Sequence, residues 1–252
     1  MHTTAIDLLL VSGSRPQLLE RTLDSFGKNL LSNFEVSTVY ANIDPFEGTA
    51  EDTQSCADLI RERFPACHIR APDTCSFTGA VKWLWSNTSA AAALHLEDDW
   101  VIDREVRPED VFPHFDNMTR QIAFLTREKN WKGSSPFHYE WSRRRIAGLN
   151  IGRKYNYDRP IFTTSPSFLE RSFAHECASK MRLDLDPEKQ LYGDRNPELG
   201  QYTKTFRSRL LGVGGDFWIS DIGREHRQAS NLKKTLIDGQ SHWIRDVHES
   251  ET

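Results

Sequence analysis

The fold of this chain is decided by the stretch AAAALHLEDDW, residues 90–100. Small and apolar residues run directly into three consecutive carboxylates, Glu97, Asp98 and Asp99. A short apolar run fits a buried strand, although periodicity alone does not separate it from a buried helical segment. Burying an unpaired charge costs more than burying apolar area gains, so we expect a strand that ends near Leu96. The three acids would then lie at its carboxyl edge, where open α/β sheets bind ligands.

Clustered carboxylates at such an edge have two chemical uses. They bind a hard divalent cation, or one of them retains a proton because like charges lie close together. A solvated acidic turn after a strand would give the same three letters. The triplet by itself does not distinguish these interpretations, so the flanking segments must be considered.

Length and composition predict a globular α/β protein. The 252 residues are enough for one large domain or two small ones. A net charge of −4 provides no global basic field for coating nucleic acid. Cys56, Cys67, Cys75 and Cys177 have no CxxC or metal-ligand spacing, so we expect reduced thiols in a cytoplasmic protein. We find no signal-peptide pattern at the start and no run near the roughly 18 apolar residues of a membrane span.

Strands and helices alternate over the first hundred residues. Pro16 suits the first turn of a helix that follows the first strand. The alternation favours a mostly parallel central sheet with helices on both faces. The expected strands before the acidic one cover 6–11, 34–43 and 68–70, and the expected helices cover 17–26, 49–64 and 73–89.

The second half of the chain is less regular. We expect a short helix near Asp110, a strand at 121–125 and a closing strand or hairpin at 210–222. Residues 126–160 are polar, basic and aromatic together. Aromatic rings interleaved with arginines can stack on sugar rings or bases, and a long solvated loop with a few anchoring aromatics has the same composition. Both interpretations of 126–160 stay open.

Two further helices are expected in this half. We expect a strand over 160–168 that leads to the first of them. Ser167 would cap this helix over 168–181, with Glu170 as its capping-box partner. Asn196 and Pro197 are typical of an N-cap and a first helical position, so a second helix would start there.

The order of these motifs resembles that of nucleotide-sugar glycosyltransferases with the GT-A fold, most closely the family-2-like enzymes. The first strand ends in SGSRP at 12–16, the second ends at Asp44, a helix starts near Phe77, and LEDD follows at 96–99. The last motif also resembles the Glu-Asp-Asp motif of the N-acetylglucosaminyltransferase I family. The resemblance covers mainly residues 6–105 and becomes looser beyond them.

The resemblance implies a single GT-A-like α/β domain over residues 1–252. Residues 1–105 would form the nucleotide-binding half and residues 106–230 the acceptor and catalytic half. Residues 231–252 would be a polar tail.

The same resemblance implies roles for individual residues. Asp99, at the Asp-x-Asp position, and His226 would bind Mn²⁺ or Mg²⁺, and Arg224 and Arg227 would meet the diphosphate. His226 is equally explained as an ordinary surface histidine. The residues implied to contact the nucleotide are Ser12, Arg15, Asp44, Glu97 and Asp98.

The general base in such enzymes is an acid at the start of a helix in the second half. Glu198 is the first candidate and Asp194 the second. Glu198 is also explained as an acid that the helix dipole favours in a first turn. A base must reach the acceptor hydroxyl within hydrogen-bonding distance, which only a structure can test.

These implications predict a metal-dependent glycosyltransferase. It would move a sugar from a nucleotide-sugar donor to a hydroxyl of a glycan or another acceptor, with inversion. A leaving diphosphate develops negative charge, which a divalent cation neutralises. One alternative is a metal-dependent nucleotidyltransferase or phosphohydrolase. The other is a non-enzymatic domain that binds carbohydrate or nucleic acid through residues 126–160, although nothing else in the sequence indicates nucleic acid.

Overall fold

A seven-stranded sheet forms the centre of the molecule. The computed structural model describes residues 5–127, 129, 131–133, 135–212 and 215–224, and the backbone of 232–237 and 240–245. The strand order is β10 (Arg207–Leu211), β6 (Thr119–Phe124), β9 (Ser167–Glu170), β4 (Ala92–Glu97), β1 (Ala5–Ser12), β2 (Glu35–Ile43) and β3 (Cys67–Arg70). Neighbouring strands are parallel except at β9, which is antiparallel to both β4 and β6.

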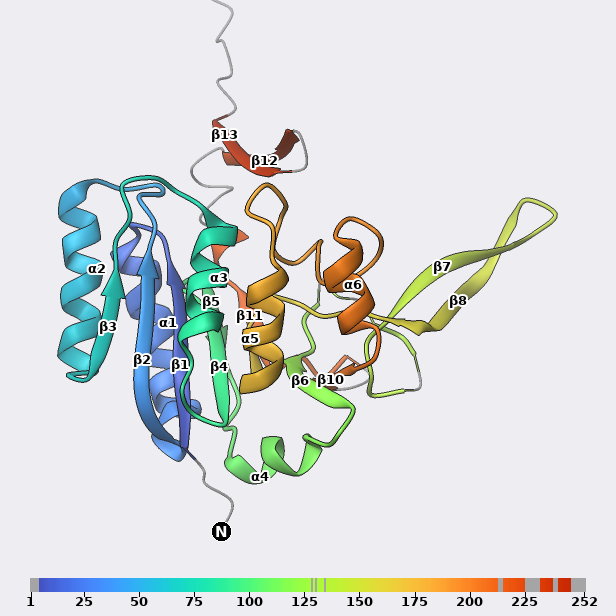
Figure 1. Ribbon diagram of the computed structural model, residues 1–252, viewed down its shortest axis with the longest axis horizontal. Helices are drawn as coiled ribbons and strands as arrows, with labels where there is room; N and C mark the ends of the chain where they lie inside the picture. Colours follow the sequence, from blue (N-terminus) through green and yellow to red (C-terminus); the bar gives the residue numbers. More distant parts are fainter. Residues whose placement is uncertain are drawn as a thin grey trace, which may run out of the picture.

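Helices cover both faces of this sheet (Figure 1). One face carries α1 (Pro16–Asn29) and α2 (Ala50–Arg63), and the other carries α3 (Phe77–Asn87), α5 (Arg171–Lys180) and α6 (Pro197–Thr203). Successive side chains of β1 enter the two layers alternately. Leu8 belongs to the core that contains Phe26 of α1, whereas Leu9 belongs to the core that contains Trp85 of α3. The prediction of a mostly parallel sheet covered on both faces is confirmed.

Local sequence signals explain where the helices of the first half begin. Pro16 occupies the first turn of α1. Thr49 caps α2 in a capping box with Asp52, and each side chain accepts a hydrogen bond from the backbone N–H of the other. The Ser76 hydroxyl caps α3 by accepting the N–H of Gly79 at 3.1 Å. The strands and helices expected in the first hundred residues are confirmed to within a few residues.

The expected helix over 168–181 starts later than predicted, because Ser167–Glu170 is strand β9. These residues fill the gap between β4 and β6 and pair with both. Phe168 and Leu169 enter the two opposite cores, a period-two burial that a helix cannot provide. Glu170, expected three residues into the helix, is instead the N-cap of α5, and its carboxylate accepts the N–H groups of Ser172 and Phe173.

Residues 139–160 form a two-stranded hairpin rather than a loop. Strands β7 (Tyr139–Ile146) and β8 (Leu149–Pro160) pair with each other and project from the body (Figure 1). Ala147 and Gly148 connect them, with φ angles of 49° and 81°. A two-residue turn with both φ angles positive matches the twist of the flanking strands, which explains why the chain reverses at this point.

Short elements complete the described chain. Strand β5 (Trp100–Ile102) follows the acidic triplet and pairs with β11 (Ile219–Asp221), and β12 (Leu232–Ile237) pairs with β13 (Gln240–Arg245) within the expected tail. The remaining helical segments are η1 (Leu31–Asn33), α4 (Pro108–Val111) and η2 (Phe112–His114). Within the part of the chain that is described, no helix combines the length and the apolar character needed to cross a bilayer. All four cysteines are free thiols.

Candidate active site

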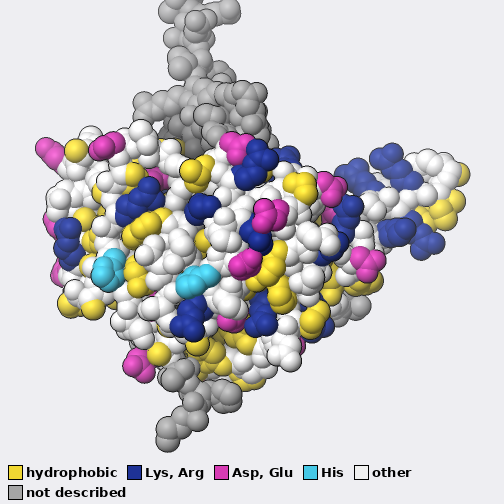
Figure 2. All heavy atoms as spheres, viewed as in Figure 1, with side chains coloured by type: hydrophobic (Ala, Val, Ile, Leu, Met, Phe, Trp, Pro, Cys, Tyr) yellow, Lys and Arg dark blue, Asp and Glu magenta, His cyan; other side chains and the backbone are white. Residues whose placement is uncertain are grey.

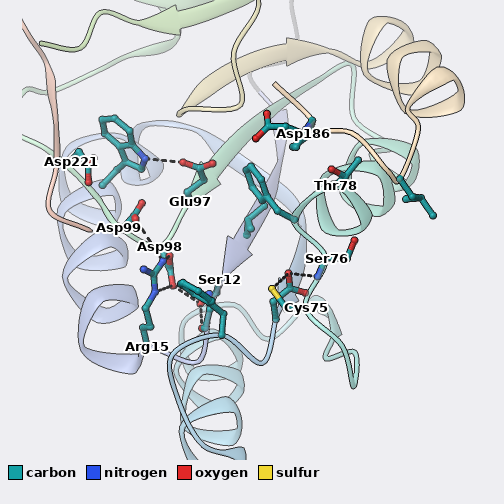
Figure 3. A pocket seen from close by; sticks show the side chains of 18 of the residues that line it. Ser12, Arg15, Cys75, Ser76, Thr78, Glu97, Asp98, Asp99, Asp186 and Asp221 are labelled. Carbon is teal, nitrogen blue, oxygen red and sulfur yellow. Dashed lines mark hydrogen bonds and ion pairs between the residues drawn. The ribbon is translucent and has the colours of Figure 1, made fainter. Parts of the chain in front are cut away.

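A cavity of about 580 Å³ opens at the carboxyl ends of β1, β2 and β4 (Figure 3). The chain leaves β1 through α1 toward β2 on one side, whereas β4 lies on the other side of β1. This reversal of strand order leaves a crevice at the sheet edge, where open α/β folds bind ligands. The volume is within the range of small-molecule sites.

The lining of this cavity is strongly acidic. Among the described residues that line it, Arg15 is the one cationic side chain. Such a wall repels a phosphate-bearing ligand unless a cation offsets the charge. The lining carboxylates are those of Asp44, Glu97, Asp98, Asp99, Asp186 and Asp221.

Asp98 is buried and binds the loop that follows β1. Its carboxylate accepts hydrogen bonds from Ser12 Oγ at 3.1 Å, from the Gly13 N–H at 2.9 Å and from Arg15 Nε at 3.2 Å. Arg15 Nη2 forms an ion pair with the same carboxylate. The Asp98 backbone also accepts the Thr22 hydroxyl at 2.7 Å. Asp98 therefore fixes the β1–α1 loop against the end of β4.

Glu97 and Asp99 have different surroundings from Asp98. Asp99 Oδ2 lies 3.6 Å from Arg15 Nη2, and its side chain is 13% exposed. Glu97 accepts a hydrogen bond from Trp100 Nε1 at 3.0 Å. Burial raises the pKa of Glu97 well above its ordinary range, and the negative charge of Asp99 raises it further. The pair therefore favours a bound positive charge, whether a proton or a metal ion.

Asp44 connects the end of β2 to the start of α3. Its Oδ1 accepts Asn42 Nδ2 at 2.8 Å, and its Oδ2 accepts the Ser76 N–H at 3.1 Å. The Cys75 thiol also donates to Oδ2, with a sulfur–oxygen distance of 3.6 Å. Loss of solvation and the nearby Asp44 charge raise the pKa of Cys75 to about 12, so this thiol stays protonated at neutral pH.

Asp221 and Asp186 are lining residues that sequence reasoning missed. Asp221 ends β11 directly opposite Trp100, and the adjacent Ile222 N–H donates to the Asp99 carbonyl at 2.9 Å. Asp186 lies in the loop before α6, on the wall across from Asp99 (Figure 3). Both depend on how the second half docks onto the first. No sequence motif around Asp186 or Asp221 indicates that these residues reach the cavity.

The structure brings together part of the predicted site. Ser12 and Arg15 line the cavity along with the predicted carboxylates of the first half, Asp44, Glu97, Asp98 and Asp99. Arg224 follows β11, and its N–H donates to Asp221 Oδ1 at 3.0 Å, but its side chain does not line the cavity. The predicted His226 and Arg227 lie outside the described residues.

The two candidate bases lie away from the cavity lining. The expected N-cap is confirmed, because Asn196 Oδ1 accepts the Leu199 N–H. Glu198 sits in the first turn of α6, is 71% exposed and accepts a hydrogen bond from Lys180 Nζ at 2.8 Å. Asp194 is exposed in the preceding loop. Neither lines the cavity.

The described residues do not provide a closed cage for a metal ion. No group of three or more His, Cys, Asp or Glu side chains in the described ranges is arranged to hold one. Mg²⁺ in sites that handle phosphates is usually bound by one or two carboxylates together with substrate oxygens and water. Asp99, with Asp221 from the neighbouring strand, fits that open type of donor set.

Comparisons with known proteins were made by sequence and by structure. No protein-family model and no curated protein matches the sequence. The mannosyltransferase PcManGT from Pyrobaculum calidifontis, solved with GDP-Man and Mn²⁺, superposes with a TM-score of 0.54 at 11% identity. The match covers 84% of this chain and 58% of the mannosyltransferase. The chain has a GT-A-like fold.

Two further solved structures resemble the chain more distantly. GalNAc-T7 with UDP, GalNAc and Mn²⁺ has a TM-score of 0.49 at 11% identity, covering 83% of this chain and 44% of that one. Residues 1–349 of S. aureus TarS with UDP have a TM-score of 0.48 at 12% identity, covering 83% and 58%. The superposition on the mannosyltransferase confirms the expected GT-A-like α/β fold.

Proposed function

We propose that this chain is a glycosyltransferase that uses a nucleotide-sugar donor and a divalent cation. The observation that carries the proposal is the cluster of carboxylates at the switch point of a GT-A-like sheet, which includes both Asp99 and Asp221. The structural likeness to a mannosyltransferase solved with GDP-Man and Mn²⁺ supports the same donor class.

In this proposal Asp99 and Asp221 would hold Mn²⁺ or Mg²⁺. When bound, the ion would neutralise the charge that develops on the departing diphosphate. Arg15 lies 3.6 Å from Asp99, so its guanidinium could meet a phosphate oxygen on the same side. The roles of His226 as a metal ligand and of Arg224 and Arg227 as contacts of the diphosphate stay predictions.

The nucleotide would lie against the ends of β1 and β2. Asp44 faces the cavity and presents its carboxylate beside Cys75 and Ser76. Because Asp98 already accepts hydrogen bonds from Ser12, Gly13 and Arg15, we assign it to shaping the loop rather than to touching the ribose. Glu97, next to Trp100, is the better placed of the two for contact with the donor.

Inversion by direct displacement needs a base near the acceptor hydroxyl, on the side opposite the leaving group. Glu198 is ion-paired with Lys180 and exposed, so its position does not support the role predicted for it. Asp186 is the lining carboxylate that faces the cavity from the second half of the chain before β10. We therefore propose Asp186 as the base in place of Glu198 and Asp194.

A thermal-shift panel tests the proposal. Nucleoside diphosphates and nucleotide sugars are screened with and without Mn²⁺ on the wild type, Asp99→Asn and Asp221→Asn. Asp58→Asn, which removes an exposed carboxylate on α2, is the matched control. We expect ligands that carry one particular nucleotide base to raise the thermal transition of the wild type and the control, and only when Mn²⁺ is present. Both site variants should lose this stabilisation.

The same panel separates the other classes. Stabilisation by nucleoside triphosphates with no response to any nucleotide sugar would favour a nucleotidyltransferase or phosphohydrolase. Ligand binding that is indifferent to EDTA and to Asp99→Asn would favour a non-enzymatic binding domain. The assignment of Asp186 as the base is tested with Asp186→Asn. This variant should hydrolyse the donor at the wild-type rate but no longer transfer the sugar to an acceptor. Transfer at an unchanged rate would exclude it.

A further inference from the structure

The β7–β8 hairpin is anchored at its base and projects away from the body (Figure 1). At the base, the ring centroids of Trp131 and Tyr155 lie 4.7 Å apart, and those of Tyr139 and Tyr157 lie 5.1 Å apart. Trp131 and Tyr139 are buried in a small core of their own. No residue of the hairpin lines the acidic cavity. The feature is therefore an arm that is packed at its base and whose outer part lies outside the lining of that cavity.

The outer end of the arm is apolar. Ile146, Leu149 and Ile151 surround the turn and are 57%, 72% and 48% exposed. Across the described residues, six large hydrophobic side chains are exposed, and four of them, these three and Tyr157, lie on this hairpin. Single exposed apolar residues need no explanation, whereas a cluster at a projecting tip indicates an interaction surface.

The stem behind this apolar tip is cationic. Arg143, Arg144 and Arg145 lie on β7, and Arg153 and Lys154 lie on β8, where Arg153 pairs with Arg143. The chain has no acidic residue from 141 to 157. Figure 2 shows these basic side chains along the arm, with hydrophobic side chains at its end. We call residues 143–145, 153 and 154 the basic collar.

Two members of the collar repel each other within the fold. Arg143 is the direct cross-strand partner of Arg153, and like charges in that position destabilise a sheet. The Arg153 guanidinium lies 4.0 Å from the centre of the Trp141 ring, which holds it in place on that face. An anion bound between the two strands would offset this repulsion.

We propose that the hairpin binds the surface of a bilayer that contains anionic lipids. Ile146, Leu149 and Ile151 insert among the headgroups, and the basic collar contacts lipid phosphates. Membrane-surface elements combine an apolar part with clustered Lys and Arg in this way. A nucleic acid or another soluble polyanion would use the collar and leave the apolar tip in water, so the tip favours the lipid. The inference does not depend on the proposed transferase activity.

Vesicle flotation with the full-length chain tests this inference. The vesicles contain phosphatidylcholine alone or mixed with phosphatidylglycerol. The tip variant carries Ile146→Ser, Leu149→Ser and Ile151→Ser, and the collar variant carries Arg143→Gln, Arg144→Gln and Arg145→Gln. Met118→Ser is the control for the tip, because Met118 is exposed elsewhere on the body. Arg61→Gln, Arg107→Gln and Arg182→Gln together match the charge change of the collar variant on exposed sites.

We expect the wild type and both controls to bind the mixed vesicles and to bind phosphatidylcholine at least about tenfold more weakly. The tip variant and the collar variant should each lose at least about tenfold of the binding to mixed vesicles. Unchanged thermal transitions of the variants would show that they fold.

Three results would overturn the inference. The first is wild-type binding by the tip variant, and the second is equal binding to both vesicle types. The third is absence of vesicle binding together with tight binding of heparin or an oligonucleotide that the collar variant loses, because that pattern assigns the arm to soluble polyanions. Each of them can be obtained whether or not the chain proves to be a transferase.

Discussion

At the scale of single residues, three adjacent acids have three different environments. All three line the cavity, but Asp98 accepts hydrogen bonds from Ser12, Gly13 and Arg15. Glu97 instead accepts a hydrogen bond from Trp100, and Asp99 lies 3.6 Å from Arg15 Nη2. The alternation of side chains along β4 and the turn after it cause this separation. A sequence shows three equivalent carboxylates, and only the packing of the β1–α1 loop distinguishes them.

The same substitution is therefore predicted to change the free energy of unfolding much more at Asp98 than at Asp99. Asp98→Asn breaks a buried ion pair and should lower the free energy of unfolding by about 3 kcal/mol. Asp99→Asn should change it by less than about 1 kcal/mol, because its side chain is partly exposed and lies among other acids. Urea unfolding measures both. Equal losses in the two variants would contradict the structural role assigned to Asp98.

A buried histidine makes stability depend on pH. His95 on β4 is fully buried, and burial lowers its pKa from 6.5 to about 3; its Nδ1 accepts a hydrogen bond from Trp85 Nε1 at 3.1 Å. Below pH 6.5 the unfolded chain takes up a proton that the folded chain excludes until about pH 3. The free energy of unfolding should therefore fall with decreasing pH across that window, by up to about 1.4 kcal/mol per pH unit.

Removing this histidine should flatten the pH profile. Burial also lowers the pKa of His138 to about 3, so His95→Gln should remove part of the slope between pH 6.5 and pH 4 and not all of it. Thermal unfolding across that range measures the slope, and His68→Gln, on an exposed histidine, is the control. An unchanged slope in His95→Gln would show that the folded and unfolded chains protonate His95 over the same pH range, which contradicts a lowered pKa.

At the scale of elements, the sequence predicts the first half of the chain well and the second half less well. The elements of residues 5–97 follow local rules: an apolar run, a turn residue, and for each helix either a capping side chain or a proline in the first turn. Strand β9 lies later than the strand expected over 160–168, because its partners, β4 and β6, lie elsewhere in the chain and a capping pattern at Ser167 favoured a helix. The hairpin was missed because three successive arginines hide the alternation of β7.

Two helix caps in different surroundings should differ in their contribution to stability. Thr49 caps α2 at the surface, and Thr49→Ala should cost about 1 kcal/mol. Asn196 caps α6 while buried, and its amide also donates to the Lys180 carbonyl and to Gln190 Oε1, both at 2.9 Å. Asn196→Ala should therefore cost about 2–3 kcal/mol, because buried partners are left unsatisfied.

Chemical denaturation compares the two cap variants under identical conditions. Thr49→Ser retains the hydroxyl for the cap and is the conservative control. Asn196→Asp retains an oxygen for the cap but loses both amide donations. A cost for Asn196→Ala no larger than that for Thr49→Ala would show that the two additional hydrogen bonds of Asn196 contribute no net stability.

At the scale of the whole molecule, the candidate site combines residues that are distant in sequence. Ser12, Asp44 and Asp99 come from the ends of strands that the alternation pattern already identified. Asp186 and Asp221 reach the cavity only because the second half docks across the sheet. The strand-end acids were therefore predictable from periodicity, whereas the opposite wall depends on tertiary contacts that no local pattern reports. For the same reason Glu198, chosen for its place at a helix start, does not line the cavity.

The position of β9 predicts that the first half cannot fold alone. A chain of residues 1–117 contains β1 to β4 but lacks β9, so one edge of β4 has no partner, and α3 lacks the contact with α5. An open, apolar strand edge promotes association with other chains. We expect this fragment to self-associate, measured by size-exclusion chromatography with light scattering. A monomer with a cooperative thermal transition would show that residues 6–105 form an independent unit.

The arrangement of β9 also constrains the order of events on the ribosome. The acid-bearing strand β4 emerges early, but its second neighbour is synthesised only after β6 and the projecting hairpin have been made. Asp221, on the wall beside Asp99, emerges later still. A prematurely terminated chain therefore contains most of the cavity carboxylates but lacks the later strands that position them. Binding competence therefore requires synthesis through Asp221, and chains that stop before β9 should be prone to aggregate through the unpaired edge of β4.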